Sequence, residues 1–483
     1  MKKPDTGDMP AESFRQYGHQ LIDWIADYFA AIESHPVLPQ VHPGDIAGSL
    51  PASAPEQGEA MQDILADIER LIMPGMTHWN HPDFFAYFSS SASGPGVLAE
   101  LLSGAFNINS MVWKAAPAAT ELEQVVMGWL RQMLGLPEDF FGIIYDGGSA
   151  STLHAIAAAR EQADADFRAK GLAGMPDKRL RMYISDQAHS SVEKAALVLG
   201  LGREGVRTIP VDSAFRMRPD MLQQAINADR SNDWTPFCVV ATAGTTSTTS
   251  IDPIAETAAL CRDENLWLHI DACYGGAAAI LPEKRDLFRG WEFSDSIVVN
   301  PHKWMFIPID LSAFYTRKPD ILRRAFSLIP EYLRTQEDGE VINQMDYGIQ
   351  LGRRFRSLKL WFVLRYFGQE GMRARIREHL RLARLFAQWV DEAKDFERLA
   401  PVPLSTVCFR YIPDDGLSEE ELEARNASLL QRINSERQFF LSHTKVQGKY
   451  MLRMAINNLR SEEKHVRAAW QHICKHARAT RDT

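Results

Sequence analysis

The chain has few cysteines, no long apolar run and no excess of basic residues, and each shortage excludes a class of protein. Its 5 cysteines are scattered over 483 residues without C-x-x-C spacing, which argues against a disulfide framework and a structural zinc site and favours a reducing compartment. No apolar run approaches the roughly 18 residues of a membrane span, and no apolar core follows the polar N-terminus as it would in a signal peptide. These absences predict a cytoplasmic protein that is not embedded in a membrane.

The charge balance is mildly acidic. There are 53 Lys and Arg residues against 62 Asp and Glu residues, a net charge of −9, and no basic stripe that would follow a phosphate backbone. We therefore do not expect nucleic acid as a partner. The hydrophobic fraction of 45% is ordinary for a globular protein, and the length allows more than one domain with a large core.

The sequence pattern of the N-terminal region predicts a helical arm over residues 1–90. A helix begins after Pro10 with a broad aromatic stripe, and a second amphipathic segment over residues 61–72 stops before Pro74. Two such helices bury little surface against each other, so the arm should pack on another domain or on a second subunit. Residues 80–93 mix small and aromatic side chains, which either line an apolar pocket or fill a core.

After Leu136 strands alternate with helices. The predicted strands are 141–145, 181–185, 206–210, 237–242, 266–272, 296–299 and 312–316. Because helical patterns separate several of them, the alternation predicts an α/β fold with a mostly parallel sheet covered by helices on both faces. We place this large domain at residues 91–360.

The sequence pattern of the remaining chain predicts a loop and then a small α+β domain over residues 361–483. Residues 326–349 are charged with little periodicity, so they form either a lid or a surface segment. The later elements expected are a long helix over 358–390, strands near 406–411 and 450–456, a helix opened by the capping box Ser418-x-x-Glu421, and a last helix over 461–476.

Lys303 follows the buried strand 296–299, which ends at Asn300-Pro301. Ligands bind at the carboxyl ends of strands in α/β sheets, and an apolar surround favours a neutral, nucleophilic amine. Since His302 and Trp304 flank it, Lys303 is a candidate Schiff-base lysine. The alternative is a solvated surface lysine, which is the commoner fate of this residue type.

Other strand ends carry groups that complement such a lysine. Gly147-Gly148-Ser149 opens a helix whose free N–H groups suit a phosphate, although its spacing is neither that of the P-loop nor G-x-G-x-x-G, and the glycines can be purely steric. Asp271 closes a very apolar strand, where its carboxylate either pairs with a protonated pyridine nitrogen or caps a helix.

Two further turns complete the set. His189 either stacks on a planar ring or caps the next helix, and Thr246 lies in the hydroxyl-rich turn 244–247. Together the strand ends of one sheet offer phosphate donors, a stacking ring, a carboxylate and an amine. Pyridoxal phosphate requires this set of groups. We expect this cofactor and no metal ion in the site.

Several segments resemble the group II pyridoxal-phosphate decarboxylases, and within them the aromatic-L-amino-acid decarboxylases. They are Asp186-Gln-Ala-His189-Ser-Ser, His269-Ile-Asp271-Ala, Asn300-Pro-His-Lys303-Trp, Leu351-Gly-Arg-Arg-Phe-Arg-Ser-Leu-Lys, Thr77-His-Trp79 and Phe84-Phe-Ala-Tyr87-Phe88. The resemblance covers nearly the whole chain and implies the fold of the fold-type I, aspartate-aminotransferase-like enzymes.

The resemblance also implies roles at the cofactor. Lys303 would bind the cofactor as a Schiff base, and Asp271 would pair with its pyridine nitrogen. The other cofactor contacts implied are Gly148, Ser149 and Asn300 at the phosphate, and Thr246, His302 and the stacking His189 near the ring.

On the substrate side the resemblance implies a wall and a partner subunit. The wall would consist of Trp79, Tyr87, Phe88 and Ser90, with His189 facing the substrate carboxylate. The family is homodimeric with sites at the interface, and Asn109 and Met111 would reach the neighbouring subunit's pocket. Gly352 stands where some relatives carry serine, which leaves room for a bulky ring.

The predicted reaction is decarboxylation of an aromatic L-amino acid, of the DOPA, tryptophan, 5-hydroxytryptophan, tyrosine or phenylalanine class, to the amine and carbon dioxide. Tyr332 matches the tyrosine that protonates Cα in family members, whereas aldehyde-forming relatives tend to carry phenylalanine. Tyr332 therefore favours the amine as product, and it favours the interpretation of residues 326–349 as a lid. The alternatives are an aldehyde synthase, a transaminase, a decarboxylase of a non-aromatic amino acid and, more remotely, a cofactor-binding regulator, which would need a basic helix-turn-helix that we do not find.

Overall fold

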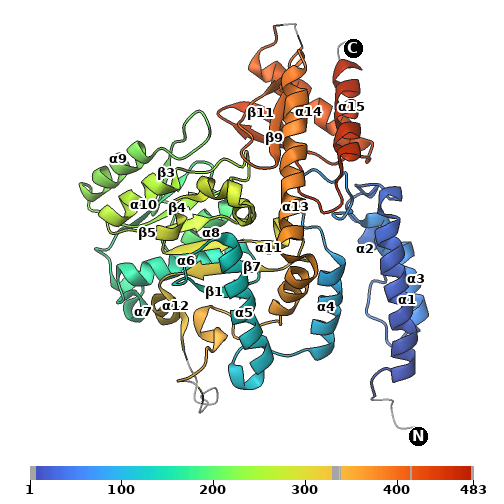
Figure 1. Ribbon diagram of the computed structural model, residues 1–483, viewed down its shortest axis with the longest axis horizontal. Helices are drawn as coiled ribbons and strands as arrows, with labels where there is room; N and C mark the ends of the chain where they lie inside the picture. The colour runs from blue at the N-terminus through green and yellow to red at the C-terminus, as the bar shows by residue number, and fades with distance from the viewer. Residues whose placement is uncertain (1–6, 329–336, 338, 414–415, 480–483) are drawn as a thin grey trace.

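A seven-stranded sheet lies at the centre of the computed structural model, which describes residues 7–328, 337, 339–413 and 416–479 (Figure 1). Its order is β1-β7-β6-β5-β4-β2-β3, and β7 runs antiparallel to both its neighbours while the other pairs are parallel. The strands are β1 Phe141–Tyr145, β2 Leu180–Ser185, β3 Val206–Ile209, β4 Thr235–Thr242, β5 Trp267–Asp271, β6 Ser296–Val299 and β7 Ser312–Thr316. The predicted strands and the mostly parallel sheet are confirmed.

Helices cover both faces of this sheet. On β4, Cys238 and Val240 belong to one buried cluster, and Val239 and Ala241 belong to another. The first cluster includes side chains of α6 (Gly148–Ala163), α8 (Ser190–Val198) and α12 (Pro319–Phe326), and the second those of α5 (Pro117–Leu134), α9 (Pro219–Arg230) and α10 (Ile254–Asp263). A strand buried on both sides must be apolar at successive positions, as β4 is.

The C-terminal unit is a four-stranded antiparallel sheet with two helices. The sheet order is β10-β11-β9-β8, from β8 Phe396–Arg398, β9 Thr406–Tyr411, β10 Ser442–Val446 and β11 Lys449–Ala455, and the helices are α14 Glu419–Ser435 and α15 Glu463–Ala479. The predicted capping box is confirmed, because Ser418 and Glu421 each accept a hydrogen bond from the other's backbone N–H. Strands β8 and β10 were not predicted because β8 is very short and β10 is polar.

Helix α13 (Ser357–Glu392) joins the two units, and Gly368, at φ 64°, interrupts its helical geometry. Its residues up to Leu380 pack into the core of the large sheet, whereas residues from Leu382 onward pack into the C-terminal core. Trp304, next to Lys303, donates its Nε1–H to Nδ1 of His379 on this helix, at 2.9 Å. The strand end that carries Lys303 is thereby tied to the connecting helix.

The N-terminal helices form a separate group at the right of Figure 1. They are α1 Ala11–Ala30, which has no buried residue, α2 Asp45–Ser49 and α3 Met61–Asp67, and α3 continues as a π turn to Ile72 before Pro74. The helices expected after Pro10 and over residues 61–72 are confirmed, and α2 was not predicted. Helix α4 (Gly94–Phe106) follows, and the short helices α7 (Phe167–Lys170) and α11 (Pro301–Trp304) complete the α-helices described.

No helix among the described residues is both long and apolar enough to cross a membrane. Of the predicted loop 326–349, the structure describes a 3-10 helix at Gln344–Tyr347. Tyr332 lies outside the described residues.

Candidate active site

A cavity of about 330 Å³ opens at the carboxyl ends of the parallel strands. Every residue predicted to contact the cofactor lines it, namely Gly148, Ser149, His189, Thr246, Asp271, Asn300, His302 and Lys303. They follow β1, β2, β4, β5 and β6, which lie far apart in sequence and meet only because parallel strands end at one edge. The set that the sequence suggested is therefore assembled in one place.

Three stacked aromatic rings stand beside the Lys303 amine. Its Nζ lies 5.5 Å from the centroid of the Phe88 ring. Phe88 stacks on Tyr274 with 3.6 Å between centroids, and Tyr274 stacks on Trp304 at 4.7 Å. Phe88, Tyr274 and Trp304 are buried. This aromatic stack, which we call the Phe88 wall, gives the cavity a rigid apolar side.

Asp271 is a buried acid at the end of β5, only 5% exposed. Its Oδ1 accepts the backbone N–H of Cys273 at 3.1 Å, and within the described part of the chain it forms no ion pair. That bond closes a local turn and does not cap an α-helix, so it leaves the charge of the carboxylate without a cationic partner. Because a buried carboxylate needs such a partner, the protonated pyridine nitrogen of the cofactor fits this position.

The start of α6 forms a cup that suits a phosphate. A Cβ added to Gly148 would lie 2.5 Å from Sγ of Cys273 and 2.8 Å from Nδ2 of Asn300, so only glycine fits there. Oδ1 of Asn300 accepts a hydrogen bond from Ser312 at 2.7 Å, which fixes the side-chain amide. The first N–H groups of a 16-residue helix then face the cavity with the positive end of its dipole.

Both histidines in the cavity are oriented by hydrogen bonds to Nδ1. Nδ1 of His189 accepts the Ser191 N–H at 3.2 Å, so His189 both caps α8 and lines the cavity. Burial lowers the pKa of His189, against an opposing effect of Asp271. Nδ1 of His302 accepts the Leu311 N–H at 2.9 Å, and burial, with a smaller effect of Lys303, lowers the pKa of His302 to about 4. His302 is therefore neutral at neutral pH, with its hydrogen on Nε2.

A second cavity of about 660 Å³ adjoins the first and shares Phe88, His189, Thr246 and Lys303 with it. Arg453 on β11 lines this second cavity and was not predicted. Its Nη1 donates to the Tyr87 carbonyl at 2.8 Å, its Nε donates to that of Ser247 at 3.2 Å, and its Cζ lies 4.6 Å from the Phe88 ring centroid. Arg453 thus holds Phe88 from the C-terminal unit, and an arginine inside the apolar strand sequence Met-Leu-Arg-Met-Ala was the signal for it.

Other residues of the first cavity were also missed. They are Asp146, Ser191, Thr242, Cys273, Tyr274, Ile309 and Asp310. Cys273 and Tyr274 follow Asp271 directly, so their place at a strand end was the available signal. Asp310 depends on a contact distant in sequence, because Nε of Arg356 donates to it at 2.8 Å.

The predicted substrate-side residues divide into two groups. Tyr87 and Phe88 line the second cavity, and Trp79 stacks on Tyr87 with 6.0 Å between centroids. Trp79 and Ser90 line neither cavity.

The other group, Asn109, Met111 and Gly352, forms a cluster that we call the Asn109 patch. Nδ2 of Asn109 donates to Sδ of Met111 at 3.4 Å, and a Cβ on Gly352 would lie 3.8 Å from the same nitrogen. Asn109 and Gly352 are exposed, and no member of the patch lines the Lys303 cavity of its own chain. The three residues therefore meet one another without meeting Lys303.

Comparisons with known proteins agree with this geometry. Residues 43–412 match the model of the pyridoxal-dependent decarboxylase conserved domain. The chain is 43% identical to the aromatic-L-amino-acid decarboxylase of Sus scrofa over 96% of each chain, and 40% identical to the phenylacetaldehyde synthase of Arabidopsis thaliana over 97% of this chain and 96% of the other. It superposes on the crystal structure of Catharanthus roseus tryptophan decarboxylase in complex with L-tryptophan with a TM-score of 0.92 and 37% identity, covering 98% and 99% of the two chains.

The strand-end cavity, the fold and the match over most of the chain agree with one another, and the protein belongs to the pyridoxal-dependent decarboxylase family.

Proposed function

We propose that the protein decarboxylates an aromatic L-amino acid to the corresponding amine and carbon dioxide. The observation that carries the proposal is the placement of Lys303, Asp271 and His189 on one cavity beside the Phe88 wall. The similarity to aromatic-L-amino-acid and tryptophan decarboxylases supports an aromatic substrate.

Bound pyridoxal phosphate supplies a sink for the electron pair that carbon dioxide leaves behind. In the proposed division of roles, the Lys303 amine binds the cofactor and Asp271 keeps the proton on its pyridine nitrogen. Gly148 and Ser149 hold the phosphate with the N–H groups of α6, and Asn300 helps to fix that turn. Thr246 and His302 complete the walls of the cofactor site.

The protein's remaining tasks are to orient the carboxylate and to return a proton to Cα. His189 lies near both Asp271 and Lys303, and its cap on α8 fixes its imidazole ring, so it orients the substrate carboxylate. The Phe88 wall excludes water from the bond that breaks. Tyr332 remains the predicted proton donor to Cα and the determinant of amine rather than aldehyde.

One experiment tests the reaction and the aldehyde alternative together. Cofactor-loaded protein is incubated with tryptophan, DOPA, tyrosine, phenylalanine, histidine and glutamate while carbon dioxide, amine, aldehyde and hydrogen peroxide are measured. We expect amine and carbon dioxide in equal amounts from at least one aromatic substrate. Carbon dioxide with aldehyde and peroxide in the wild type would make the protein an aldehyde synthase, and no carbon dioxide from any substrate would refute the proposal.

A Tyr332→Phe variant in the same assay is expected to move product from amine toward aldehyde, because the proton donor is lost. Amine formation at the wild-type rate without aldehyde would show that Tyr332 has no such role.

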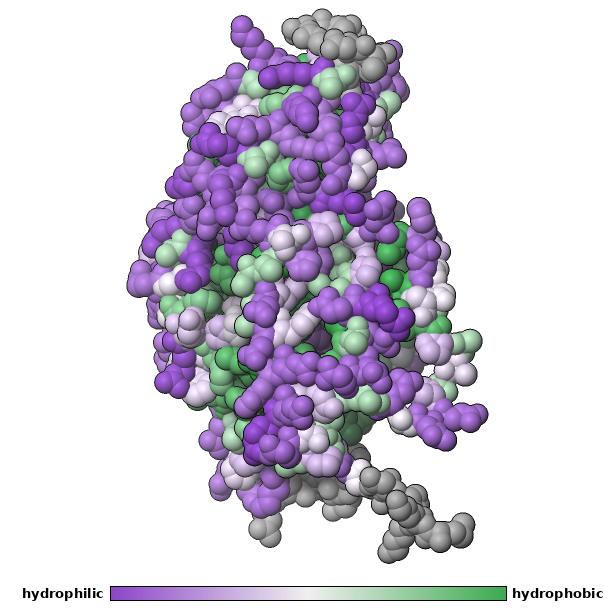
Figure 2. All heavy atoms as spheres, turned by 90° about the vertical axis from the view of Figure 1, so that its right-hand side faces the viewer, coloured by the Kyte–Doolittle hydropathy of each residue, from purple (hydrophilic) through white to green (hydrophobic). Residues whose placement is uncertain are grey.

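The protein is further proposed to be a cytoplasmic homodimer with residues 1–90 as an arm on the partner, 91–360 as the cofactor domain and 361–483 as the small domain. Helix α1 has no buried residue, and Phe14, Leu21 and Ile22 on it are exposed. On α4, Leu98, Leu101 and Phe106 are exposed too. Figure 2 shows the side of the molecule that carries the N-terminal helices, with hydrophobic side chains across its middle and lower parts. Several exposed hydrophobic side chains on two helices are typical of a surface that another protein covers.

The dimer proposal places the Asn109 patch of one subunit against the Lys303 cavity of the other. A complementation experiment tests this by co-expressing Lys303→Ala chains with Gly352→Trp chains, each of which should be inactive alone. If the patch acts on the partner's cavity, each mixed dimer has one intact site, and random assembly should restore about a quarter of wild-type activity. If the patch serves its own chain, no mixed dimer has an intact site and activity stays absent.

A further inference from the structure

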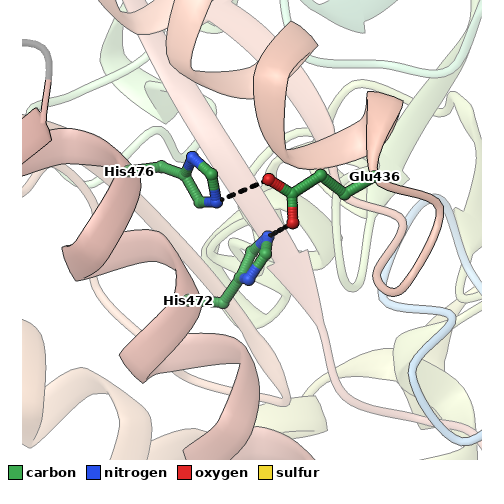
Figure 3. Close-up of side chains that lie close together, drawn as sticks. All are labelled: Glu436, His472 and His476. Atoms are coloured by element: carbon green, nitrogen blue, oxygen red, sulfur yellow. Dashed lines mark ion pairs between the residues drawn. The ribbon is translucent and has the colours of Figure 1, made fainter.

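Three side chains that could bind a metal ion converge in the C-terminal unit, outside both cavities of the active site. Glu436 directly follows α14, and His472 and His476 lie one turn apart on α15. In Figure 3 both imidazole rings point their Nε2 atoms at the carboxylate of Glu436. The distances are 3.5 Å from His472 Nε2 to Oε2 and 3.0 Å from His476 Nε2 to Oε1.

Neither nitrogen is satisfied by a hydrogen bond. Both Nε2 atoms are shielded from solvent, and neither has a hydrogen-bond partner among the residues that the structure describes. The two imidazole side chains are each only 10% exposed. Among the described residues, the polar contact of each nitrogen is its ion pair with Glu436. Buried polar atoms without a hydrogen bond are uncommon in proteins, and a bound ion would give both nitrogens a direct bond.

The spacing suits a tetrahedral ion. With metal–ligand distances near 2.1 Å, two ligands of a tetrahedral zinc ion lie about 3.4 Å apart. The two nitrogen–oxygen distances, 3.0 and 3.5 Å, lie on either side of that value. All the ligand atoms lie within 4.8 Å of one another, so small side-chain rotations suffice to close the site.

The ligands are held by packed elements. Ala469 and Ile473 anchor α15 in the C-terminal core. The two imidazole rings lie 4.4 Å apart at 54°, and the buried Phe439 ring lies 5.1 Å from that of His472. Since neighbouring rings fix both imidazoles, little conformational entropy remains to be lost when an ion binds.

We propose that Glu436, His472 and His476 form a binding site for a divalent first-row transition metal ion, with zinc as its natural occupant. Two imidazoles and one carboxylate suit zinc, cobalt, nickel or copper, whereas magnesium and calcium prefer oxygen ligands throughout. Three protein ligands leave a fourth position for water. The bound ion would join α15 to the end of α14, and it would stabilise the C-terminal unit without entering the reaction at Lys303.

The chain offers a matched control on the same helix. Nε2 of His465, also on α15, lies 3.4 Å from Oε1 of Glu33 and is likewise buried without a hydrogen-bond partner. It has no second imidazole within ligand distance in the described part of the chain. A pair of one imidazole and one carboxylate should not retain zinc, so His465→Asn removes a similar histidine without touching the proposed site.

The test treats the cofactor-loaded protein with a chelator, exposes one sample to zinc and another to magnesium, and dialyses both exhaustively. Metal content is measured by mass spectrometry, and the melting temperature is recorded with and without zinc. We expect one retained zinc per chain and a rise of about 2 °C or more at saturation. His472→Gln/His476→Gln and the single exchange Glu436→Gln should abolish both effects, whereas His465→Asn should keep both.

Two results would overturn the proposal. The first is that the wild-type protein retains no zinc, or that it retains magnesium as well as it retains zinc. The other is zinc retention that persists in both the histidine double variant and Glu436→Gln, which would place the ion on other groups such as the free cysteines. Because Glu436 is partly exposed, Glu436→Gln should fold even if the double variant does not.

Discussion

The Lys303 cavity and the Asn109 patch differ in how much of each is completed within a single chain. The cavity collects all of its predicted cofactor residues from five strand ends and closes one side with three stacked rings. The patch gathers Asn109, Met111 and Gly352 apart from the Lys303 cavity, with Asn109 and Gly352 exposed and Met111 partly buried. The difference indicates that one chain assembles the residues proposed for the cofactor, whereas the proposed role of the patch in substrate choice requires a partner subunit.

The largest effect expected from breaking the cavity is that of Lys303→Ala. Without the amine that binds the cofactor, activity should fall by about 1,000-fold or more, and the absorbance of covalently bound cofactor should disappear. Lys318→Ala is the matched control, because the amine of Lys318 pairs with Asp295, away from the cavity. Residual activity above a few per cent in Lys303→Ala would mean that Lys303 is not the cofactor lysine.

Two glycines, one inside and one outside the cavity, provide the next test. A Cβ on Gly148 would collide with Cys273 and Asn300, whereas a Cβ on Gly58, which does not line the cavity, would meet nothing within 4 Å. Gly148→Ala should therefore weaken cofactor affinity by about 5- to 150-fold, as expected when 1–3 kcal/mol of overpacking strain enters a close-packed site. Gly58→Ala should change it less than threefold. Affinity is measured by titrating apoenzyme with pyridoxal phosphate, and equal losses in the two variants would refute the proposed cup.

The sequence predicted the cavity better than its surroundings, for a physical reason. Asp271 ends β5 and Lys303 lies in the short helix that follows β6, and the β-branched and apolar residues of these strands made them recognisable. The fold then brings the strand ends together. Arg453 and Asp310 reach the site through contacts between distant segments, for which no local pattern exists. The spacing of His472 and His476 is visible in the sequence, but their meeting with Glu436 depends on how α15 packs against α14.

The buried character of the cavity gives a third, smaller prediction about pH. The pKa of His302 is about 4 in the folded protein, below the roughly 6.5 of an unfolded chain, so its stabilising contribution is complete above pH 6.5 and is lost as pH falls toward 4. Because of this group, the free energy of unfolding of the wild type should be about 2 kcal/mol lower at pH 5.0 than at pH 7.5. In His302→Asn, whose amide oxygen can accept the Leu311 N–H, the difference between the two pH values should shrink by that amount.

Chemical denaturation at both pH values measures this effect. The exposed His443 supplies the control, because His443→Asn should leave the difference between the two pH values as it is in the wild type. An unchanged difference in His302→Asn would mean that His302 is solvated or already charged in the folded protein.

The smallest effect is expected at the patch, and it distinguishes the two regions most directly. The Cβ of a serine at position 352 would have Nδ2 of Asn109 as its one neighbour within 4 Å among the described residues, at the ordinary contact distance of 3.8 Å, so Gly352→Ser should fold and bind cofactor as the wild type does. If the patch faces the partner's cavity, the added side chain should raise KM for tryptophan about tenfold, and less for the smaller phenylalanine, with little change in kcat. Gly58→Ser, also at an open position, should change neither constant. A loss of cofactor affinity in Gly352→Ser would instead make the patch part of the Lys303 cavity, and equal KM values for both substrates would remove it from substrate selection.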